Sequence, residues 1–350
     1  TNIIFIFIGM KLLRCILYPL ALLYGFLVAI RNFFFDKGFF KTHTISMPSI
    51  GVGNLSSGGT GKSIVIDYLI VLLKKTHSIS VLSRGYKRET SGVVVGTVNS
   101  SAAMIGDEPL QFLKKHPSIT VVVAEKRILG LNKIKEITPS NTIVLLDDIM
   151  QHRYVKPSLL IITTTFNKPY FSDHLLPTGN LRESPLGAKR ANVILVTKCP
   201  DTISNQDIDS FKIKCVLSED QHLFFTKINY SSYIFNGVSS LLLSELTSSV
   251  LLITGISDPS PMVKFLNKKG INHIHLAYPD HHTFTTSDIQ EIYKQKGESI
   301  LLTTEKDMTR IKPMIKGTYL YYLPIEMVFL HSSEKAVFEA LILNEASNIV

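Results

Sequence analysis

The stretch Val52-Gly-Asn-Leu-Ser-Ser-Gly-Gly-Thr-Gly-Lys-Ser63 decides the fold, because it joins two apolar segments of different pattern. The run 47–53 precedes it and predicts a short strand, and the run 64–73 follows it and predicts a helix. A glycine-rich turn at this position lets backbone amides converge on an anion at the start of the helix. The stretch therefore predicts a phosphate-binding loop of the P-loop type.

The residues of this loop have distinct expected roles. Lys62 should reach the β- and γ-phosphates of a nucleotide, and the hydroxyl of Ser63 should ligate Mg²⁺. The strict pattern has glycine at position 56, where this chain has serine. Glycine-serine loops without a ligand also join strands to helices, but the Gly-Lys-Ser ending is much rarer among them. The residues expected to cradle the phosphates are Ser56, Ser57, Gly58, Gly59, Thr60, Gly61, Lys62 and Ser63.

Composition indicates two folded domains in a reducing compartment. The chain has 350 residues, of which 45% are hydrophobic and 19% charged, which excludes a disordered protein. Its three cysteines form no C-x-x-C motif and indicate neither a disulfide framework nor a thiolate metal site. The net charge of +9 implies an acidic partner: nucleic acid, an anionic membrane or a phosphorylated substrate. We expect no nucleic acid, because the excess charge lies partly near the N-terminus.

Residues 1–40 are predicted to form a membrane-associated helix. The segment from Ile3 to Ile30 is strongly apolar, and no residue from Cys15 to Ile30 is charged. This uncharged run is shorter than the ~20 residues that span a bilayer, and basic residues flank it, so we favour a helix lying in the membrane interface. A single transmembrane helix, a signal peptide and a buried core helix are the alternatives, although no suitable cleavage site follows.

Strand-like and helix-like segments alternate in the rest of the chain, which predicts parallel sheets covered by helices. A P-loop α/β domain is expected at 41–223, a two-stranded hinge at 224–234, and a smaller α/β domain at 235–350. The expected strands are 78–83, 92–98, 119–123, 142–146, 159–163 and 192–197 in the first domain, and 250–254, 271–276, 299–303 and 319–323 in the second. The expected helices of the second domain are 259–269, 287–296 and 333–344.

Acidic residues gather where expected strands end, which is where open α/β sheets build their sites. Asp147 and Asp148 end an apolar strand, as in a Walker B element that holds Mg²⁺ directly or through water. A helix N-cap is the alternative for this pair. Asp107 and Glu108 lie just before an expected helix, so capping and chemistry compete there as well.

Basic residues and histidines supply further candidates. Arg84 and Arg182 lie beside turn residues and could bind phosphate oxygens through their guanidinium forks. Asp280, His281 and His282 follow a strand of the second domain. Adjacent histidines cannot both face one metal ion from a strand or helix, so an Asp or His that orients or deprotonates a hydroxyl is favoured. The polar segment 303–307 ends another strand, and the sequence leaves its role open.

Together these motifs resemble the tetraacyldisaccharide 4'-kinase family of lipid A biosynthesis, over about residues 11–334. The family also lacks the Walker glycine that Ser56 replaces here. Ile149-Met150 departs from the usual Gly or Ala followed by Phe. The matching motifs are the loop described above, Ser83-Arg-Gly-Tyr86, Gly106-Asp-Glu-Pro109, Asp147-Asp-x-x-Gln-His152, Pro177-x-Gly-x-Leu-Arg-Glu183, Asp280-His-x-x-Phe284 and Thr303-Thr-Glu-Lys-Asp307.

The resemblance implies that the γ-phosphoryl of ATP is transferred, with Mg²⁺, to the 4'-hydroxyl of tetraacyldisaccharide 1-phosphate at the cytoplasmic face of the bacterial inner membrane. Asp107 would take the hydroxyl proton with support from His281 and its neighbour Asp280. An acid of the Asp147 and Asp148 pair, with Ser63 and Glu108, would manage Mg²⁺, and Arg84 and Arg182 would bind phosphates of lipid or nucleotide. Closure about the 224–234 hinge is expected to assemble the site.

Two other functions stay open from the sequence: a membrane-bound P-loop GTPase or ATPase switch, and a nucleotide-dependent adaptor that catalyses nothing. The segment Thr197-Lys-Cys-Pro-Asp201 is a partial guanine-recognition cue, but Pro200 stands where the [NT]-K-x-D pattern requires aspartate. Adenine is therefore favoured. An adaptor leaves the Asp280-His281 pair without a role.

Overall fold

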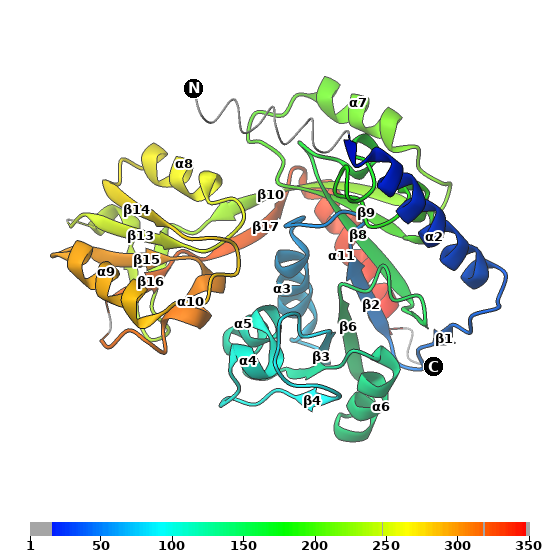
Figure 1. Cartoon of the computed structure of the whole chain (residues 1–350), viewed down its shortest axis with the longest axis horizontal. Helices are drawn as coiled ribbons and strands as arrows, with labels where there is room; N and C mark the ends of the chain where they lie inside the picture. Colours follow the sequence, from blue (N-terminus) through cyan, green and yellow to red (C-terminus); the bar gives the residue numbers. More distant parts are fainter. Residues whose placement is uncertain (1–15, 247, 318, 348–350) are drawn as a thin grey trace. The chain divides into compact units, whose positions relative to one another are not determined.

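The computed structural model describes residues 16–246, 248–317 and 319–347, and it divides into two compact units (Figure 1). The first combines the residues up to 84 with 124–227 and those from 327 onward, and the second combines 85–123 with 228–326. The domains expected from the sequence follow the chain in order, whereas each unit joins separate segments. The expectations for residues 1–15 lie outside the described residues.

The first unit is built on a sheet whose strand order is β17-β10-β9-β8-β2-β6-β3. Neighbours from β10 to β3 pair in parallel, so the expected parallel α/β sheet is confirmed. Every residue of the central strand β2 is buried. The strands are β2 (Ser49–Gly53), β3 (Ser78–Ser83), β6 (Thr142–Asp147), β8 (Leu159–Thr165), β9 (Val193–Thr197), β10 (His222–Tyr230) and β17 (Ile325–Phe329).

Helices and a short strand pair complete this unit. The P-loop helix α3 is held to the C-terminal helix by a hydrogen bond of 2.6 Å from the Tyr68 hydroxyl to Glu339. The helices are α2 (Tyr18–Asp36), α3 (Lys62–Leu73), α6 (Arg127–Ile137), α7 (Asn205–Cys215) and α11 (Ser332–Ser347), and the pair is β1 (His43–Thr44) with β7 (Val155–Lys156).

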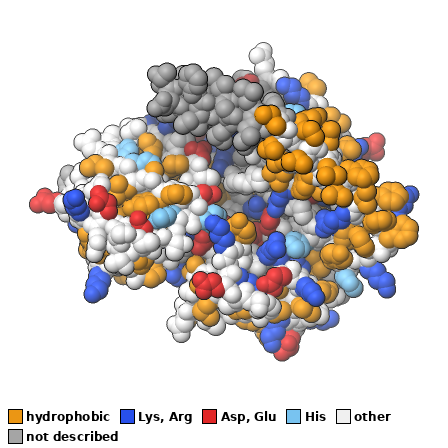
Figure 2. All heavy atoms as spheres, in the orientation of Figure 1, with side chains coloured by type: hydrophobic (Ala, Val, Ile, Leu, Met, Phe, Trp, Pro, Cys, Tyr) orange, Lys and Arg blue, Asp and Glu red, His pale blue; other side chains and the backbone are white. Residues whose placement is uncertain are grey.

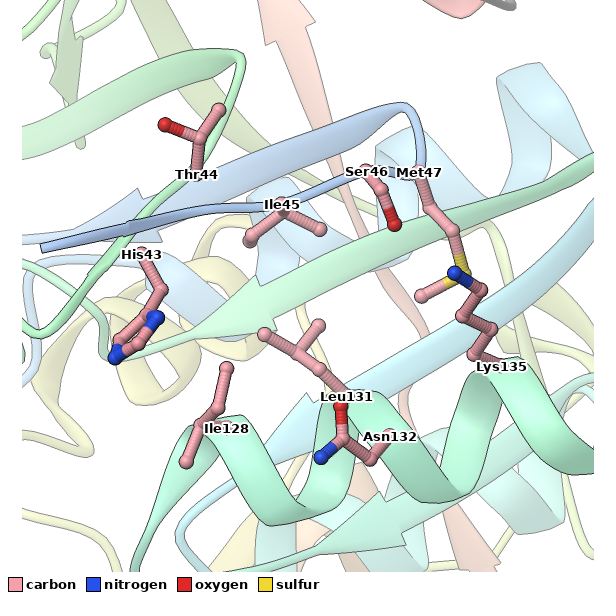
Figure 3. A pocket seen from close by; sticks show the side chains of 9 residues that line it. All are labelled: His43, Thr44, Ile45, Ser46, Met47, Ile128, Leu131, Asn132 and Lys135. Atoms are coloured by element: carbon pink, nitrogen blue, oxygen red, sulfur yellow. The ribbon is translucent and has the colours of Figure 1, made fainter.

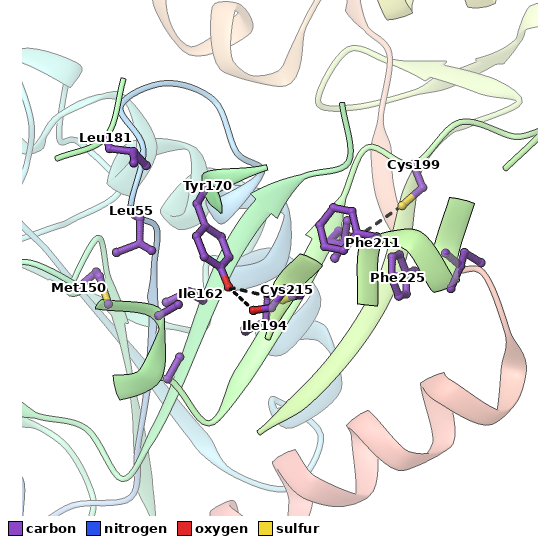
Figure 4. Packing of buried hydrophobic residues seen from close by; sticks show 14 residues of the cluster. Leu55, Met150, Ile162, Tyr170, Leu181, Ile194, Cys199, Phe211, Cys215 and Phe225 are labelled. Atoms are coloured by element: carbon purple, nitrogen blue, oxygen red, sulfur yellow. Dashed lines mark hydrogen bonds between the residues drawn. The ribbon is translucent and has the colours of Figure 1, made fainter. Parts of the chain in front are cut away.

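Leu55 of the P-loop belongs to an apolar cluster that forms part of the core of this unit (Figure 4). Leu55 of the P-loop and Leu181 of a distant loop are each 1% exposed and share one apolar cluster with Met150 and Ile162. Burying one such side chain contributes about 1.5–3 kcal/mol, so both loops are anchored to the sheet by apolar packing. Met150, where the sequence departs from the family pattern, is buried in this cluster and packs against Gly53.

The second unit contains a six-stranded sheet in the order β12-β11-β16-β15-β13-β14, and the β13, β14, β15 and β16 pairings are parallel. The segment 92–98, expected to be a strand of a parallel sheet, forms only β4, which pairs antiparallel with β5. The strands are β4 (Val94–Val95), β5 (Thr120–Val123), β11 (Tyr233–Phe235), β12 (Ser240–Leu242), β13 (Val250–Thr254), β14 (His273–Ala277), β15 (Ile300–Thr303) and β16 (Leu320–Tyr322). The helices are α4 (Ala102–Ile105), α5 (Asp107–Lys115), α8 (Ser260–Lys268), α9 (Thr286–Lys296) and α10 (Glu305–Ile311).

One face of helix α2 contacts the rest of the first unit, and its apolar face is exposed. Hydrophobic side chains gather over α2 in the space-filling view (Figure 2). The helix is long and apolar enough to cross a membrane, and only 11% of its most apolar window is buried. The described part of the expected N-terminal helix is thus confirmed as an apolar helix. Its exposed large apolar residues are Tyr18, Leu20, Leu22, Leu23, Phe26, Leu27, Ile30, Phe33 and Phe34.

Candidate functional site

The P-loop joins the end of β2 to the start of α3, as its sequence predicts. Helix α3 begins at Lys62, directly after Gly61, whose φ of +90° lies in the left-handed region that glycine adopts without strain. The start of an α-helix presents backbone amides that can bind an anion. The backbone therefore suits a phosphate group at this point.

Three side chains fix the shape of the loop through Thr60. The Thr60 hydroxyl lies 2.8 Å from Asn54 Nδ2 and 2.7 Å from the Thr163 hydroxyl. The hydroxyl of Thr197 donates to the Thr60 carbonyl at 2.7 Å. Thr163 and Thr197 belong to the neighbouring strands β8 and β9, so the sheet holds the loop in place.

A second loop pairs with the P-loop along its outer edge. Ser56 and Leu181 form an isolated antiparallel bridge. Next to it, the Arg182 amide donates to the Leu55 carbonyl at 2.8 Å and the Ser57 amide donates to the Asn180 carbonyl at 2.7 Å. We name residues 173–183 the flanking loop. It brings Arg182, more than a hundred residues distant in sequence, next to the P-loop.

Asp148 is the centre of a charged cluster beside the P-loop. Arg182 binds its carboxylate with two hydrogen bonds of 2.9 and 2.8 Å and also donates to the carbonyl and side-chain oxygens of Asn54. Lys62 Nζ lies 3.4 Å from Asp148 Oδ1. Burial raises the pKa of Asp148, but the Arg182 hydrogen bonds and the Lys62 charge outweigh burial and hold the pKa well below its usual range. Asp148 is therefore ionised at neutral pH.

Asp147 takes a different position at the end of β6. Its side chain is buried and accepts a hydrogen bond of 2.9 Å from the Ser83 hydroxyl, while Arg127 donates to its backbone carbonyl at 3.3 Å. Within the described residues, no group of three or more His, Cys, Asp or Glu side chains could hold a metal ion by itself. Carboxylate and hydroxyl oxygens at a P-loop suit Mg²⁺, which keeps several waters and binds through one or two protein ligands and substrate phosphates.

Glu183 and Gln151 form a polar network next to the Asp148 cluster. Neither residue was given a role from the sequence. Gln151 Nε2 donates to the Asn54 carbonyl at 3.0 Å and to Glu183 Oε1 at 2.9 Å. Arg190 donates to Glu183 Oε2 at 2.7 Å, and Glu183 is 2% exposed. Both residues lie in motifs quoted above, so the sequence indicated the residues but not their contacts.

Burial, together with the charges of Arg127 and Arg84, lowers the pKa of nearby His152 to about 4.

In the second unit, Asp107 and His281 form a direct pair. Asp107 begins α5, and its Oδ2 lies 3.0 Å from His281 Nδ1. His281 has a φ of +59°, an uncommon conformation for a non-glycine residue. Arg310 Nε lies 3.1 Å from the same Asp107 oxygen. Burial raises the pKa of Asp107, whereas the His281 hydrogen bond and the Arg310 charge lower it below its usual value. An ionised carboxylate beside a histidine can accept a proton.

Helix α10 supports this pair. Lys306 Nζ lies 2.7 Å from Glu108 Oε1 and 3.4 Å from His281 Nε2. Asp307 is fully buried, accepts a hydrogen bond of 2.9 Å from the Gly255 amide, and lies 3.3 Å from Arg310 Nη1. The sequence left the role of the polar segment 303–307 open. Its residues Lys306 and Asp307 form ion pairs with Glu108 and Arg310, which neighbour Asp107 or contact it.

Two of the expected site residues are exposed. Asp280 is exposed, and it precedes His281 without joining the Asp107 cluster. Arg84 is exposed at the end of β3. The partial guanine-recognition segment ends in Asp201, which forms an ion pair of 2.8 Å with Lys227.

A separate pocket of the first unit lies between α6 and the segment 43–47 (Figure 3). None of the predicted site residues appears among the described side chains that line it. The lining residues are His43, Thr44, Ile45, Ser46, Met47, Ile128, Leu131, Asn132 and Lys135.

Known proteins resemble this chain over nearly its whole length. The family model described as tetraacyldisaccharide-1-P 4'-kinase matches residues 13–346. The tetraacyldisaccharide 4'-kinase of Flavobacterium psychrophilum is 43% identical over 340 residues, which are 96% of this chain and 97% of that protein. The enzyme of the same name from Flavobacterium johnsoniae is 43% identical over 326 residues, covering 93% of this chain and 95% of that protein.

A solved structure agrees with these relatives. The crystal structure of the "apo" form of LpxK from Aquifex aeolicus in complex with ATP matches with a TM-score of 0.77 at 29% identity, covering 95% of this chain and 99% of that one. The sequence match, the shared fold and the family motifs gathered at the P-loop and around Asp107 point the same way. The chain belongs to the tetraacyldisaccharide 4'-kinase family.

Proposed function

We propose that this protein transfers the γ-phosphoryl group of ATP to the 4'-hydroxyl of tetraacyldisaccharide 1-phosphate, a step of lipid A biosynthesis. The relatives carry this activity in their names, and the solved relative was crystallised with ATP. In the transfer, the acceptor oxygen forms a bond to the γ-phosphorus while the bond to the β,γ-bridging oxygen breaks. The products are ADP and the 4'-phosphorylated lipid.

The observation that carries this proposal is the contact of 3.0 Å between Asp107 and His281. A kinase that phosphorylates an alcohol needs a group that receives the hydroxyl proton, whereas a nucleotide switch or an adaptor does not. Asp107 shares one oxygen with His281 and Arg310, which leaves its other oxygen for the acceptor hydroxyl. We assign Asp107 as the proton acceptor and His281 as the residue that orients it. Asp280, exposed and next to His281, has at most an indirect role.

On the nucleotide side, residues 56–63 bind the phosphates through loop amides and the start of α3. Lys62 reaches the β- and γ-phosphates from its position beside Asp148. Arg182, with its fork directed to Asp148, neutralises phosphate charge as transfer proceeds. Arg84, exposed at the end of β3, is available for a phosphate of the lipid.

Ser63, Asp147 and Asp148 offer oxygen atoms that suit Mg²⁺. Glu108, the other expected ligand, forms an ion pair of 2.7 Å with Lys306 in the second unit. When bound there, Mg²⁺ would neutralise the negative charge of the phosphates. Ser83 holds the Asp147 carboxylate, and Lys62 with Arg182 holds that of Asp148, so both side chains are oriented before a ligand arrives.

The enzyme works at the membrane that contains its lipid substrate, which we place at the cytoplasmic face of the bacterial inner membrane. Helix α2 supports a peripheral position over a spanning one, because Tyr24, Arg31 and Asn32 on one side of it hydrogen-bond the first unit. The opposite side presents apolar residues to a membrane interface. The chain's excess of positive charge would add attraction to anionic lipids.

The test is transfer of labelled γ-phosphate from ATP to the lipid acceptor in detergent micelles, combined with direct measurement of ATP binding. Asp107→Asn should lose at least about 100-fold in transfer while it still binds ATP, since general-base catalysis contributes that much. Lys62→Ala should lose both transfer and ATP affinity. His282 and Asp288 form a second histidine-aspartate pair, at 2.9 Å, so Asp288→Asn is a matched control that should retain transfer.

If the folded wild type binds ATP but labels no lipid, the kinase assignment fails. Slow ATP hydrolysis that ignores the lipid would then favour a switch, and binding without turnover would favour an adaptor.

A further inference from the structure

We infer that helix α2 is part of the nucleotide site as well as a membrane-facing element, and that Tyr24 and Asn32 are positioning residues for Arg182 and Glu183. The inference rests on the proposed function, because it takes a nucleotide to be the ligand of the P-loop.

The inward side of α2 contacts the flanking loop directly. The Tyr24 hydroxyl donates to the Arg182 carbonyl at 2.7 Å, and Asn32 Nδ2 donates to Glu183 Oε2 at 3.2 Å. At Gly25 the helix comes so close to the loop that a Cβ atom would lie 2.6 Å from Leu175 Cδ1. Two hydrogen bonds and a close approach thus hold the loop against one side of the helix.

The other side of the flanking loop contacts the P-loop. The Arg182 amide donates to the Leu55 carbonyl at 2.8 Å, and the Ser56 and Leu181 backbones form a bridge. The Arg182 side chain then reaches Asn54 and the Asp148 carboxylate. The flanking loop therefore lies between α2 and the P-loop and contacts both.

A second route joins the same helix to the same site. Arg31 Nη2 donates to the Gln151 carbonyl at 2.7 Å, and Gln151 Nε2 donates to the Asn54 carbonyl at 3.0 Å. Gln151 also binds Glu183 Oε1 at 2.9 Å, so the two routes meet at a buried glutamate. Asn54 receives contacts from both and in turn binds Thr60 of the P-loop.

These contacts matter because the Arg182 fork holds the Asp148 carboxylate and Asn54 beside the P-loop. The Tyr24 bond fixes the backbone from which that fork extends. A shift of about 1 Å in a positioning group can cost a large factor in rate. Freeing the Arg182 carbonyl should therefore weaken nucleotide binding and transfer without removing any group that touches the nucleotide.

The test compares Tyr24→Phe with Tyr18→Phe, which is the same change on an exposed tyrosine of the same helix. Dissociation constants for ATP are measured by calorimetry without lipid, and binding to anionic phospholipid vesicles is measured by flotation. Loss of one hydrogen bond should weaken ATP binding about fivefold in Tyr24→Phe and leave Tyr18→Phe at the wild-type value. Both variants should float with vesicles as the wild type does.

A double-mutant cycle separates positioning from simple loss of stability. If Tyr24 acts through Arg182, its effect on ATP affinity should largely disappear in an Arg182→Lys background. Asn32→Ala provides a second variant should Tyr24→Phe fold poorly. Wild-type ATP affinity in both Tyr24→Phe and Asn32→Ala overturns the inference, and so does full additivity with Arg182→Lys. Absence of lipid phosphorylation by the wild type would instead contradict the proposed function, since ATP binding is measured separately.

Discussion

At the residue scale, opposing effects act on the pKa of the Asp107 carboxylate. Burial raises its pKa, and the His281 hydrogen bond and Arg310 charge lower it, with the lowering effects in excess. Replacing Arg310 with methionine removes one of them, so the pKa of Asp107 should rise. Because the base must be ionised, the acid limb of kcat/KM for the lipid should then move to higher pH.

For Arg310→Met we expect the loss of transfer to be largest at the acid end of the pH profile and small near neutral pH, with ATP binding retained. The measurement is kcat/KM for the lipid acceptor between about pH 4 and 8. Arg310→Lys keeps the positive charge and should shift the acid limb less. An unchanged limb in Arg310→Met would show that this arginine does not influence the ionisation of Asp107.

His152 gives a second residue-scale prediction, for stability. Burial and the charges of Arg127 and Arg84 lower its pKa from 6.5 to about 4 in the folded protein. Between those values the unfolded chain binds a proton that the folded protein does not, so stability falls as the pH drops from 6.5 to 4.

Allowing for solvent around the ring, this effect should cost about 1 kcal/mol at pH 5. Urea unfolding at pH 7 and pH 5 should show a smaller difference for His152→Gln than for the wild type. His222→Gln replaces an exposed histidine and should behave as the wild type does. An equal pH difference in His152→Gln and wild type would contradict the assignment.

At the element scale, the helix that carries Lys62 and Ser63 is fixed at its outer side by α11. The Tyr68 hydroxyl donates to Glu339 at 2.6 Å, and the Tyr68 ring contacts Phe329 and Phe338. Tyr68→Phe should retain the ring packing and lose the hydrogen bond, which should reduce the free energy of unfolding by about 1–2 kcal/mol.

Chemical denaturation measures this difference. Tyr233→Phe is the control, because Tyr233 is an exposed tyrosine of β11. Equal destabilisation by both changes would show that the Glu339 bond contributes nothing specific to α3.

The sequence predicted the elements better than the contacts between them. Apolar runs separated by turn residues located β3 and β13 at their observed bounds, because a buried parallel strand is apolar throughout. Nothing in the pattern showed that Arg182 binds Asp148 or that Arg310 binds Asp107, since such pairs depend on which loops the sheet order brings together. A motif resemblance grouped Asp107 with His281; the two side chains lie 3.0 Å apart, and their catalytic roles stay a prediction.

At the scale of the whole molecule, α2 combines two kinds of surface that would conflict in a freely soluble enzyme. Its outward residues Leu23 and Phe26 are 55% and 63% exposed. In water, this apolar surface gains no stabilisation from burial. Its inward side is tied to the first unit through Tyr24 and Asn32. We propose that α2 lies in the membrane interface, which would resolve the conflict because lipid would cover the outward face while the inward contacts persist.

The double variant Leu23→Glu with Phe26→Glu tests this arrangement. Two buried charges oppose insertion, so the variant should bind anionic phospholipid vesicles at least about tenfold more weakly than the wild type in flotation. ATP affinity should stay at the wild-type value, since the inward contacts of α2 are untouched. Val238 is an exposed apolar residue of the second unit, and Val238→Glu should leave vesicle binding unchanged. Undiminished flotation of the double variant would mean that some other surface holds the enzyme to the membrane, and α2 would then serve the nucleotide site alone.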